Sequence, residues 1–313
     1  MTCELIAECC QNHNGSREIL KKMIHASAEA GATYAKIQAL RSSELTFRER
    51  FEEGQVLPDG TTKVIKRPFQ AEQDRLKKLD LSDDDEAWFV EECKRAGIKS
   101  MITVFTRLST QRLVDAGFDA VKIASYDCRS TSLLKEVSQS FRNVVVSTGA
   151  SFDNEILDAA KLFGKNQVSF LHCVTIYPTP LDQLHMNRMD WLRQFSIKVG
   201  FSDHTTPAAT NLKASMLAIA LDADIVERHF TVLEPHETRD GPVSINPSQL
   251  RVLCDFAKLS RESRIEKLSA DWPEWKIGLG QQTRDLSATE LLNRDYYSGR
   301  VASWRDGQQI SNQ

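Results

Sequence analysis

The segment Ile197-Lys198-Val199-Gly200-Phe201 is short, apolar and rich in branched side chains, which is typical of a buried strand. A helical pattern over Pro207–Leu221 follows it, and a second short apolar run, Asp224–Val226, comes next. A strand, a helix and another strand in this order favour a parallel sheet, whose strands are joined by crossover helices.

The same alternation extends through most of the chain. Further strands are predicted at Leu5–Ala7, Tyr34–Ile37, Ser100–Val104, Ala120–Ala124, Val144–Val146 and Val168–Cys173. Further helices are predicted at Arg17–Ala30, Asp83–Ala96, Ser109–Ala116, Ser132–Ser138, Asp153–Phe163 and Pro247–Leu259, with Ser109 and Asp153 as caps. Three of these helices end in Ala-Gly, as a C-cap glycine requires, at Gly31, Gly97 and Gly117.

Eight strand–helix units in about 260 residues predict a (β/α)8 TIM barrel. A doubly wound open sheet is the alternative. It is disfavoured because no GxGxxG motif follows the first strand, where the turn reads Glu8-Cys9-Cys10-Gln11-Asn12-His13-Asn14-Gly15.

Composition excludes several other classes of protein. The 313 residues include 40 basic and 43 acidic side chains, so the net charge is −3 and no basic face for a nucleic acid is expected. No run approaches the ~20 apolar residues that cross a bilayer, and no secretory signal is visible. Seven cysteines without a CxxC pair argue against a disulfide framework and favour a cytoplasmic location.

Two segments interrupt the alternation. Residues 39–82 form a long connection after the second strand, interpreted either as a functional lid or interface piece or as a mobile surface excursion. The second segment is 265–313, in which the 37 residues 277–313 are too few to form an independent core. We therefore expect a barrel over residues 1–264 and a short irregular C-terminal tail that docks on the barrel or on a partner.

Polar side chains stand at the C-terminal end of nearly every predicted strand, where barrel enzymes place their catalytic groups. One such residue is weak evidence, but the pattern repeats around the whole barrel. The candidates are Glu8, Lys36, Gln38, Thr103, Lys122, Ser125, Ser147, His172, Thr175, Tyr177, Ser202, Asp203, His204, Glu227, His229 and, in the last loop, Asp240.

Lys36 and Lys122 each lie between apolar residues of a buried strand. A buried ammonium group needs an anionic partner, because removing it from water is costly. Either an internal ion pair with Glu8 or Glu227 supplies that partner, or a small anionic substrate does, with serine hydroxyls around it.

His204 and His229 end consecutive strands, so their imidazoles are within reach of one divalent metal ion. Asp203 and Glu227 are placed to orient the two rings. His172, inside a strand, is expected to pack in the core instead.

The chain resembles the sialic acid synthase family, whose barrel enzymes join phosphoenolpyruvate to an N-acylated sugar to make nonulosonic acids. The motifs that carry the resemblance lie between residue 6 and about residue 245. They are Ile6-Ala7-Glu8 with Asn12-His13-Asn14-Gly15; Lys36-Ile37-Gln38; Lys122-Ile123-Ala124-Ser125; Ser147-Thr148-Gly149; Leu171-His172-Cys173 with Tyr177-Pro178-Thr179-Pro180; Gly200-Phe201-Ser202-Asp203-His204-Thr205; and Glu227-Arg228-His229-Phe230-Thr231.

The resemblance implies roles for these residues. Phosphoenolpyruvate would be bound by Lys36, Thr103, Lys122, Ser125, Ser147 and Ser202. The acceptor sugar would be bound by Gln38, Thr175 and Tyr177, and the metal, usually Mn²⁺ with Mg²⁺ or Co²⁺ as alternatives, by His204 and His229. Glu8, Asp240 and Glu227 would be the catalytic carboxylates.

The chain also departs from the family pattern. The family's Ser-Thr-Pro-Phe motif is Ile102-Thr103-Val104-Phe105 here, Thr175 replaces an asparagine, and Cys9-Cys10 replace Ile-Gly. Cys10 is either a small apolar filler or a third metal ligand. The C-terminal antifreeze-like domain, which supplies an arginine to the partner's sugar site, is reduced to a remnant, so that arginine cannot be assigned.

These features predict a homodimeric transferase that condenses phosphoenolpyruvate with an aldose such as N-acetylmannosamine, releasing phosphate and forming a 2-keto-3-deoxy acid. Its partners would be these small molecules, with no nucleic acid and no membrane. The alternatives are a phosphoenolpyruvate-dependent synthase for a different aldehyde, or a non-catalytic barrel. The tail with Trp272 and Trp275 and the basic 63–78 segment are the candidate dimer contacts.

Overall fold

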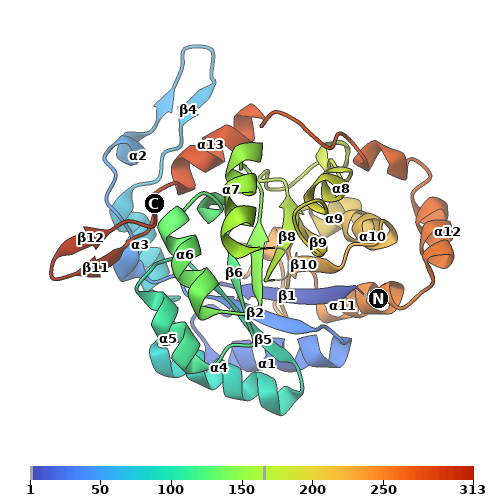
Figure 1. Cartoon of the computed structure of the whole chain (residues 1–313), viewed down its shortest axis with the longest axis horizontal. Coiled ribbons are helices and arrows are strands. Elements are labelled where there is room, and N and C mark those ends of the chain that lie inside the picture. The colour runs from blue at the N-terminus through green and yellow to red at the C-terminus, as the bar shows by residue number, and fades with distance from the viewer. Residues whose placement is uncertain (1–2, 165–166) are drawn as a thin grey trace.

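The computed structural model describes residues 3–164 and 167–313, and its central element is a closed barrel of parallel strands in the order β1-β10-β9-β8-β7-β6-β5-β2 (Figure 1). The predicted TIM barrel is therefore confirmed and the open sheet is excluded. The barrel strands are β1 (Glu4–Cys10), β2 (Tyr34–Gln38), β5 (Lys99–Val104), β6 (Ala120–Ile123), β7 (Val144–Ser147), β8 (Val168–Cys173), β9 (Lys198–Asp203) and β10 (Ile225–His229).

Helices surround the barrel and cover the outer faces of its strands (Figure 1). Gly31, Gly97 and Gly117 end three of them in the left-handed conformation, as the Ala-Gly pairs predicted. The helices are α1 (Arg17–Ala30), α4 (Asp83–Ala96), α5 (Ser109–Ala116), α6 (Thr131–Ser140), α7 (Asp153–Phe163), α8 (Arg188–Leu192), α9 (Pro207–Thr210), α10 (Lys213–Ala220) and α11 (Pro247–Ala257).

Two sequence predictions about the helices were wrong. The helix expected over 207–221 is two helices, because Asn211 has φ 52° and ψ −133°, which no helix accommodates. Ser109 and Asp153 are the first helical residues rather than the caps. The Ser109 hydroxyl donates to the carbonyl of Thr106, and α7 is capped by Glu155, which accepts from the Phe152 N–H.

The apolar core has two layers. The larger one lies between the strands and the helices, and a smaller one fills the inside of the barrel. Strands pack so closely at Gly200 that a Cβ there would lie 1.9 Å from the carbonyl oxygen of Ile225, so only glycine fits. The side chains that fill the barrel are Ile6, Tyr34, Met101, Ala120, Val145, Leu171 and Ile225.

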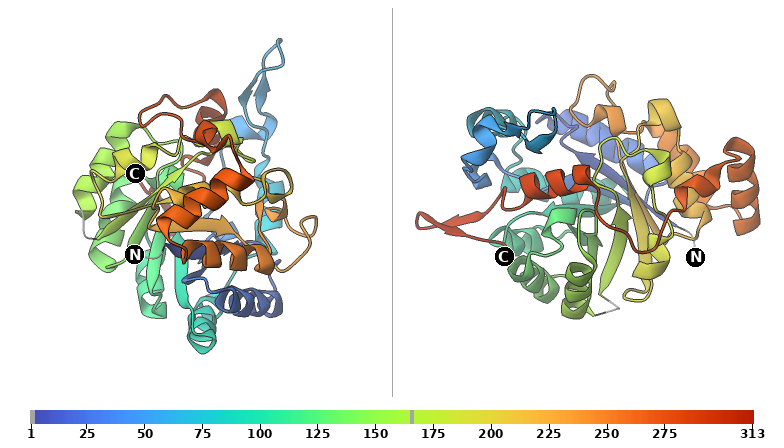
Figure 2. Two further views of the ribbon diagram at one scale, coloured as in Figure 1. Left: turned by 90° about the vertical axis from the view of Figure 1, so that its right-hand side faces the viewer. Right: turned by 90° about the horizontal axis from the view of Figure 1, so that it is seen from above.

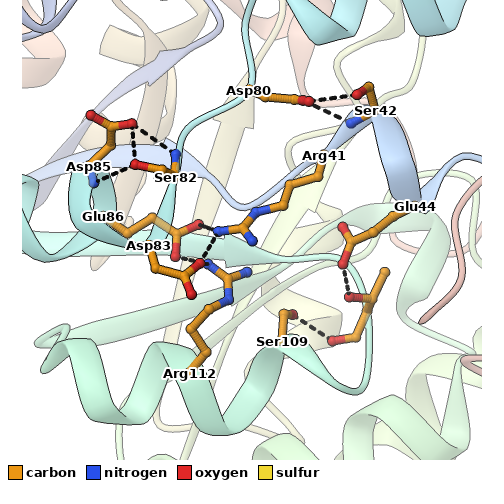
Figure 3. Close-up of polar contacts among 11 residues, drawn as sticks. Arg41, Ser42, Glu44, Asp80, Ser82, Asp83, Asp85, Glu86, Ser109 and Arg112 are labelled. Atoms are coloured by element: carbon orange, nitrogen blue, oxygen red, sulfur yellow. Dashed lines mark hydrogen bonds and ion pairs between the residues drawn. The ribbon is translucent and has the colours of Figure 1, made fainter. Parts of the chain in front are cut away.

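The long connection after β2 is an ordered excursion that begins with an ion-pair network (Figure 3). Arg41 and Arg112 both pair with Asp83 and with the buried Glu86 at the start of α4. This network fixes the base of the excursion to the barrel. The excursion contains η1 (Ser42–Glu44), α2 (Arg50–Glu53), the hairpin β3 (Gln55–Val56) with β4 (Thr62–Val64), and α3 (Phe69–Lys77).

The C-terminal segment folds back onto the barrel. It contains α12 (Arg261–Asp271), η5 (Trp275–Gly278), α13 (Ala288–Tyr297) and the hairpin of β11 (Ser303–Arg305) with β12 (Gln308–Ile310). Figure 2 shows α13 crossing between the barrel and the excursion after β2, and the two hairpins projecting from the body. Near the end of the chain, the Asn312 side chain donates to the carbonyl of Phe105 (2.7 Å) and to Asp127 (3.3 Å).

Within the part of the chain that the structure describes, no helix has the length and apolarity that crossing a membrane requires. All seven cysteines are buried and free. His172 packs in the core, as expected, and its Nε2 lies 2.6 Å from the carbonyl oxygen of Leu184.

The docked tail leads to a prediction about pH and stability at Asp127. Burial raises the pKa of this carboxyl to about 6, against hydrogen bonds from Ser130 and Asn312 that lower it. Since an unfolded aspartate has a pKa of about 3.9, the folded chain binds more protons between about pH 4 and 6, and this group's contribution to stability falls as pH rises through that window.

Asp127→Asn should therefore increase the free energy of unfolding at pH 7 by about 1–3 kcal/mol and change it little at pH 4. Denaturant unfolding of both proteins at the two pH values measures the difference. Asp115→Asn, at an exposed aspartate, is the matched control. An equal effect of Asp127→Asn at both pH values would contradict the prediction.

Candidate functional site

A cavity of about 600 Å³ opens at the C-terminal ends of the barrel strands. This volume lies in the range that holds small organic ligands. The structure brings every residue of the predicted site to the wall of this one cavity: Glu8, Lys36, Gln38, Thr103, Lys122, Ser125, Ser147, Thr175, Tyr177, Ser202, His204, Glu227, His229 and Asp240.

Buried charges form the floor of the cavity. Lys122 pairs with Glu227, and Lys36 pairs with Glu8 and lies 3.4 Å from the second oxygen of Glu227. All four side chains are at least 93% buried. In this structure, each lysine is paired with a glutamate of the protein itself. These side chains lie on the parallel strands β1, β2, β6 and β10. The register of each strand with its neighbours sets how far along the barrel axis its side chain lies.

Burial and neighbouring charges shift the pKa values of Glu227 and Lys36. Burial favours the neutral form of Glu227, but the charges of Lys122 and Lys36 overcome this effect and hold its pKa well below the usual range. Burial lowers the pKa of the Lys36 ammonium, and the charge of Glu227 opposes that shift. The floor therefore consists of buried, mutually paired lysine and glutamate side chains.

Hydroxyl groups surround this charged floor. Thr103 accepts a 2.9 Å hydrogen bond from Lys36, and Ser202 donates one of 2.9 Å to Glu227. Ser125 accepts from the N–H of Gly149. By contrast, the hydroxyls of Ser147 and Thr175 are buried and have no hydrogen-bond partner among the described residues. Unpaired buried hydroxyls are rare and point to a polar ligand.

The two histidines of the predicted metal site are neighbours. The ring centroids of His204 and His229 lie 5.3 Å apart, and burial lowers the pKa of both, so both rings are neutral as ligands must be. The tightest group of possible ligand atoms, however, is Cys10, His229 and Asp240, all within 4.8 Å of one another. His204 is outside this group, and its Nδ1 lies 3.6 Å from the Cys173 sulfur.

Cys10 has an unusual backbone that brings it to this group. Its φ is 38°, and the pairing of β1 with β2 shifts between Glu8 and Cys10. Its buried thiol donates to Asp240 at 3.3 Å, and burial together with the Asp240 charge raises the pKa of that thiol. The suggestion that Cys10 is a metal ligand stays a prediction, now with Asp240 beside it.

The expected acceptor residues lie further out. Gln38 is the last residue of β2, and Tyr177 is half-exposed, with its ring 4.4 Å from that of His204. Thr175 lies beside Gly149. These residues lie above the lysines. A larger substrate bound there would contact a smaller substrate bound at the floor.

The outer wall contains residues that the sequence did not indicate. Glu72 and Arg75 come from α3, Arg239 from the loop after β10, and Arg300 from the segment after α13. Arg67 and Arg75 lie in the basic 63–78 segment, which was expected as a dimer contact and not as part of a cavity wall. The other arginines stand alone in segments that read as surface. The remaining unexpected lining residues of the C-terminal segment are Thr289, Asn293, Arg294 and Tyr297.

A closed barrel with lysines, hydroxyls and imidazoles gathered at its C-terminal mouth defines a class: a barrel enzyme that binds small anionic substrates. The comparisons with known proteins identify the family. The NeuB family matches residues 23–267, more than half of the chain, so the protein belongs to this family.

Several relatives of this chain are named as synthases of nonulosonic acids. It is 28% identical over 264 residues to the N,N'-diacetyllegionaminic acid synthase of Campylobacter jejuni, covering 80% of this chain and 74% of the relative. It is 25% identical over 269 residues to human N-acetylneuraminate-9-phosphate synthase, covering 82% and 70%. The structure of the N-acetylneuraminic acid synthetase from Leptospira borgpetersenii, in complex with citrate, superposes with a TM-score of 0.69 at 25% identity, covering 95% and 91%.

The buried Lys122–Glu227 pair leads to a prediction about stability. Lys122→Met leaves Glu227 without its closest partner and should lower the free energy of unfolding by about 3–5 kcal/mol. Combining it with Glu227→Leu should restore about half of that loss, since Lys36 keeps Glu8 as its partner. Denaturant unfolding of the single and double variants measures both effects.

Lys161→Met is the matched control, because Lys161 pairs with Asp158 on the surface. It should change the free energy of unfolding by less than about 0.5 kcal/mol. A double variant no more stable than Lys122→Met would contradict the coupling.

Proposed function

We propose that this protein is a synthase that condenses phosphoenolpyruvate with an aldose, such as N-acetylmannosamine, to give a nonulosonic acid and phosphate. One observation carries the proposal: all the residues that such a reaction needs line a single cavity whose buried hydroxyls at Ser147 and Thr175 have no partner among the described residues. The named relatives, which are synthases of this kind, support it.

Phosphoenolpyruvate would bind at the floor. Its carboxylate and phosphate would meet the Lys36 and Lys122 ammonium groups, with the hydroxyls of Thr103, Ser125, Ser147 and Ser202 completing the shell. Glu8 and Glu227 pair with the two lysines and hold them in position at the floor. The aldose would lie above, against Gln38, Thr175 and Tyr177.

In the reaction, the methylene carbon of phosphoenolpyruvate forms a bond to the aldehyde carbon of the open-chain sugar, and the aldehyde oxygen takes up a proton. Water then adds to C2 and loses a proton, and the C2–O bond to phosphate breaks. The sum is phosphoenolpyruvate, aldose and water giving the 2-keto-3-deoxy acid and phosphate. Positioning two substrates in one cavity accounts for up to ~7–11 kcal/mol of the barrier.

Two carboxylates are candidates for moving the water proton. Glu8 is buried at the floor, where it accepts from the Cys10 N–H at 2.6 Å and pairs with Lys36. Asp240 lies in the loop after β10, less buried, against Cys10. Both are general-base candidates in the proposed site.

The residues at the mouth fit a divalent metal. The Nδ1 of His229 is buried without a hydrogen-bond partner among the described residues, and it belongs to a residue whose neighbours offer a thiol and a carboxylate. His204 and His229, with Cys10 and Asp240, would hold the ion, which when bound supplies Lewis-acid polarisation of a carbonyl oxygen. Imidazole and thiolate donors suit Co²⁺ or Zn²⁺ better than Mg²⁺, and the Asp240 carboxylate is the donor that suits Mn²⁺.

The proposed activity is tested with phosphoenolpyruvate, Mn²⁺ and a panel of aldoses, including N-acetylmannosamine. We expect phosphate release that depends on an aldose, and a product whose mass equals the sum of both substrates and water less phosphoric acid. Lys122→Met should lower kcat/KM at least about a hundredfold, because it removes a charged substrate contact. Lys161→Met is again the control. The absence of phosphate release with every aldose would contradict the proposal.

The metal site is tested by metal content and spectroscopy. We expect the intact protein to bind one transition metal ion, and a Co²⁺-loaded sample to show a thiolate charge-transfer band. Cys10→Ser should remove that band and weaken binding at least about tenfold, whereas Cys254→Ser, which changes a cysteine on the outer helix layer, should do neither. Unchanged affinity and spectrum in Cys10→Ser would show that Cys10 is a packing residue only.

A homodimer and a cytoplasmic location complete the proposed picture of the enzyme. The family resemblance supports the dimer, and the seven free cysteines support a reducing compartment.

A further inference from the structure

Three guanidinium groups converge on one carboxylate at the outer wall of the cavity. Arg75 makes two hydrogen bonds to Glu72, of 3.0 and 2.9 Å, Arg300 makes one of 2.5 Å, and Arg239 lies 3.4 Å from the same carboxylate. Arg67 also lines the cavity beside them. We call Arg67, Arg75, Arg239 and Arg300 the arginine rim.

The arginine rim has more positive charge than its own partner neutralises. Three arginines, Arg75, Arg239 and Arg300, pair with the carboxylate of Glu72, which leaves a formal excess of two positive charges in this group. Partial burial of the Glu72 carboxylate raises its pKa. The hydrogen bonds and charges of these arginines outweigh burial and lower the pKa to about 2. Like charges gathered around one anion repel one another, and a second anion in the cavity relieves that repulsion.

The hydrogen-bonding capacity of the rim is also incompletely used. Arg300 is 7% exposed, and its Nε has no partner among the described residues. Arg75 reaches both Glu72 and Gln11, which holds its planar group in a fixed orientation. Guanidinium groups fixed in this way suit the bidentate recognition of phosphate and carboxylate oxygens.

The rim is separate from the floor. The floor residues Lys36 and Lys122 lie on barrel strands, whereas the rim comes from α3 and from the loops after β4, β10 and α13. One cavity of about 600 Å³ joins the two sites. A substrate bound in this cavity can therefore contact both the lysines of the floor and the arginines of the rim.

We propose that the arginine rim binds an anionic group, a phosphate ester or a carboxylate, at the end of the acceptor sugar remote from its aldehyde. This inference rests on the proposed synthase function and specifies its substrate class: the preferred aldose is charged. The rim would select this substrate by its charge, and the remaining contacts to the sugar would be made by uncharged side chains.

The test compares binding of three matched sugars to the intact chain by calorimetry: N-acetylmannosamine, its 6-phosphate and its 6-carboxylate. We expect at least one charged sugar to bind about tenfold or more tightly than the neutral one, and the better of the two tells phosphate from carboxylate recognition. The preference should weaken as salt increases.

Arg75→Gln and Arg239→Gln should each reduce affinity for the preferred charged sugar by about tenfold to a hundredfold, with little change for phosphoenolpyruvate or the neutral sugar. Arg261→Gln, which removes an exposed arginine paired with Asp222 away from the cavity, is the matched control. An equal loss for the neutral sugar would show that the arginines only support the fold and would overturn the inference, as would the absence of any preference for charge.

Phosphate release in the same samples separates this inference from the synthase proposal. If a charged sugar binds preferentially and no phosphate is released from phosphoenolpyruvate, the synthase fails and the anion site stands. If phosphate is released as efficiently with the neutral sugar as with the charged ones, the synthase stands and the anion site fails.

Discussion

The architecture of the site depends on the cost of removing charge from water. Two lysines project into the barrel near its C-terminal end. An unpaired ammonium group there would destabilise the fold by several kcal/mol. Glu8 and Glu227 on neighbouring strands prevent this, since they face the lysines at heights that the parallel pairing sets. The parallel pairing of the strands closes the barrel and also positions these lysines and glutamates. It therefore determines both the fold and the arrangement of charged groups in the site.

The inner part of the site could be predicted from the sequence because each strand places its last residues at the cavity. Lys36 and Lys122 are polar residues within apolar strands, and His229 ends one, so their position in the barrel could be predicted. The outer wall could not be predicted in this way. Arg75, Arg239 and Arg300 come from segments with no common periodicity, and only the tertiary fold brings them to Glu72.

Two local features could not be predicted from the sequence because they depend on the backbone conformation. Asn211 interrupts an apolar helical pattern by adopting a positive φ, which composition did not indicate. Cys10 likewise has a positive φ at a shift in strand register, so its side chain meets Asp240, a residue 230 positions away. The spacing of apolar residues predicts which face of a regular helix or strand is buried. Asn211 and Cys10 lie where a regular element ends, so this spacing does not predict their conformation.

The wall made by residues 289–300 also bears on how the enzyme is made. A ribosome synthesises the barrel strands first, and the segment that brings Asn293, Arg294 and Arg300 to the mouth emerges only after the last of them. A nascent barrel therefore has its buried lysine–glutamate floor before it has a complete entrance. The wall that Asn293, Arg294 and Arg300 contribute is thus added to a barrel whose buried ion pairs come from earlier parts of the chain.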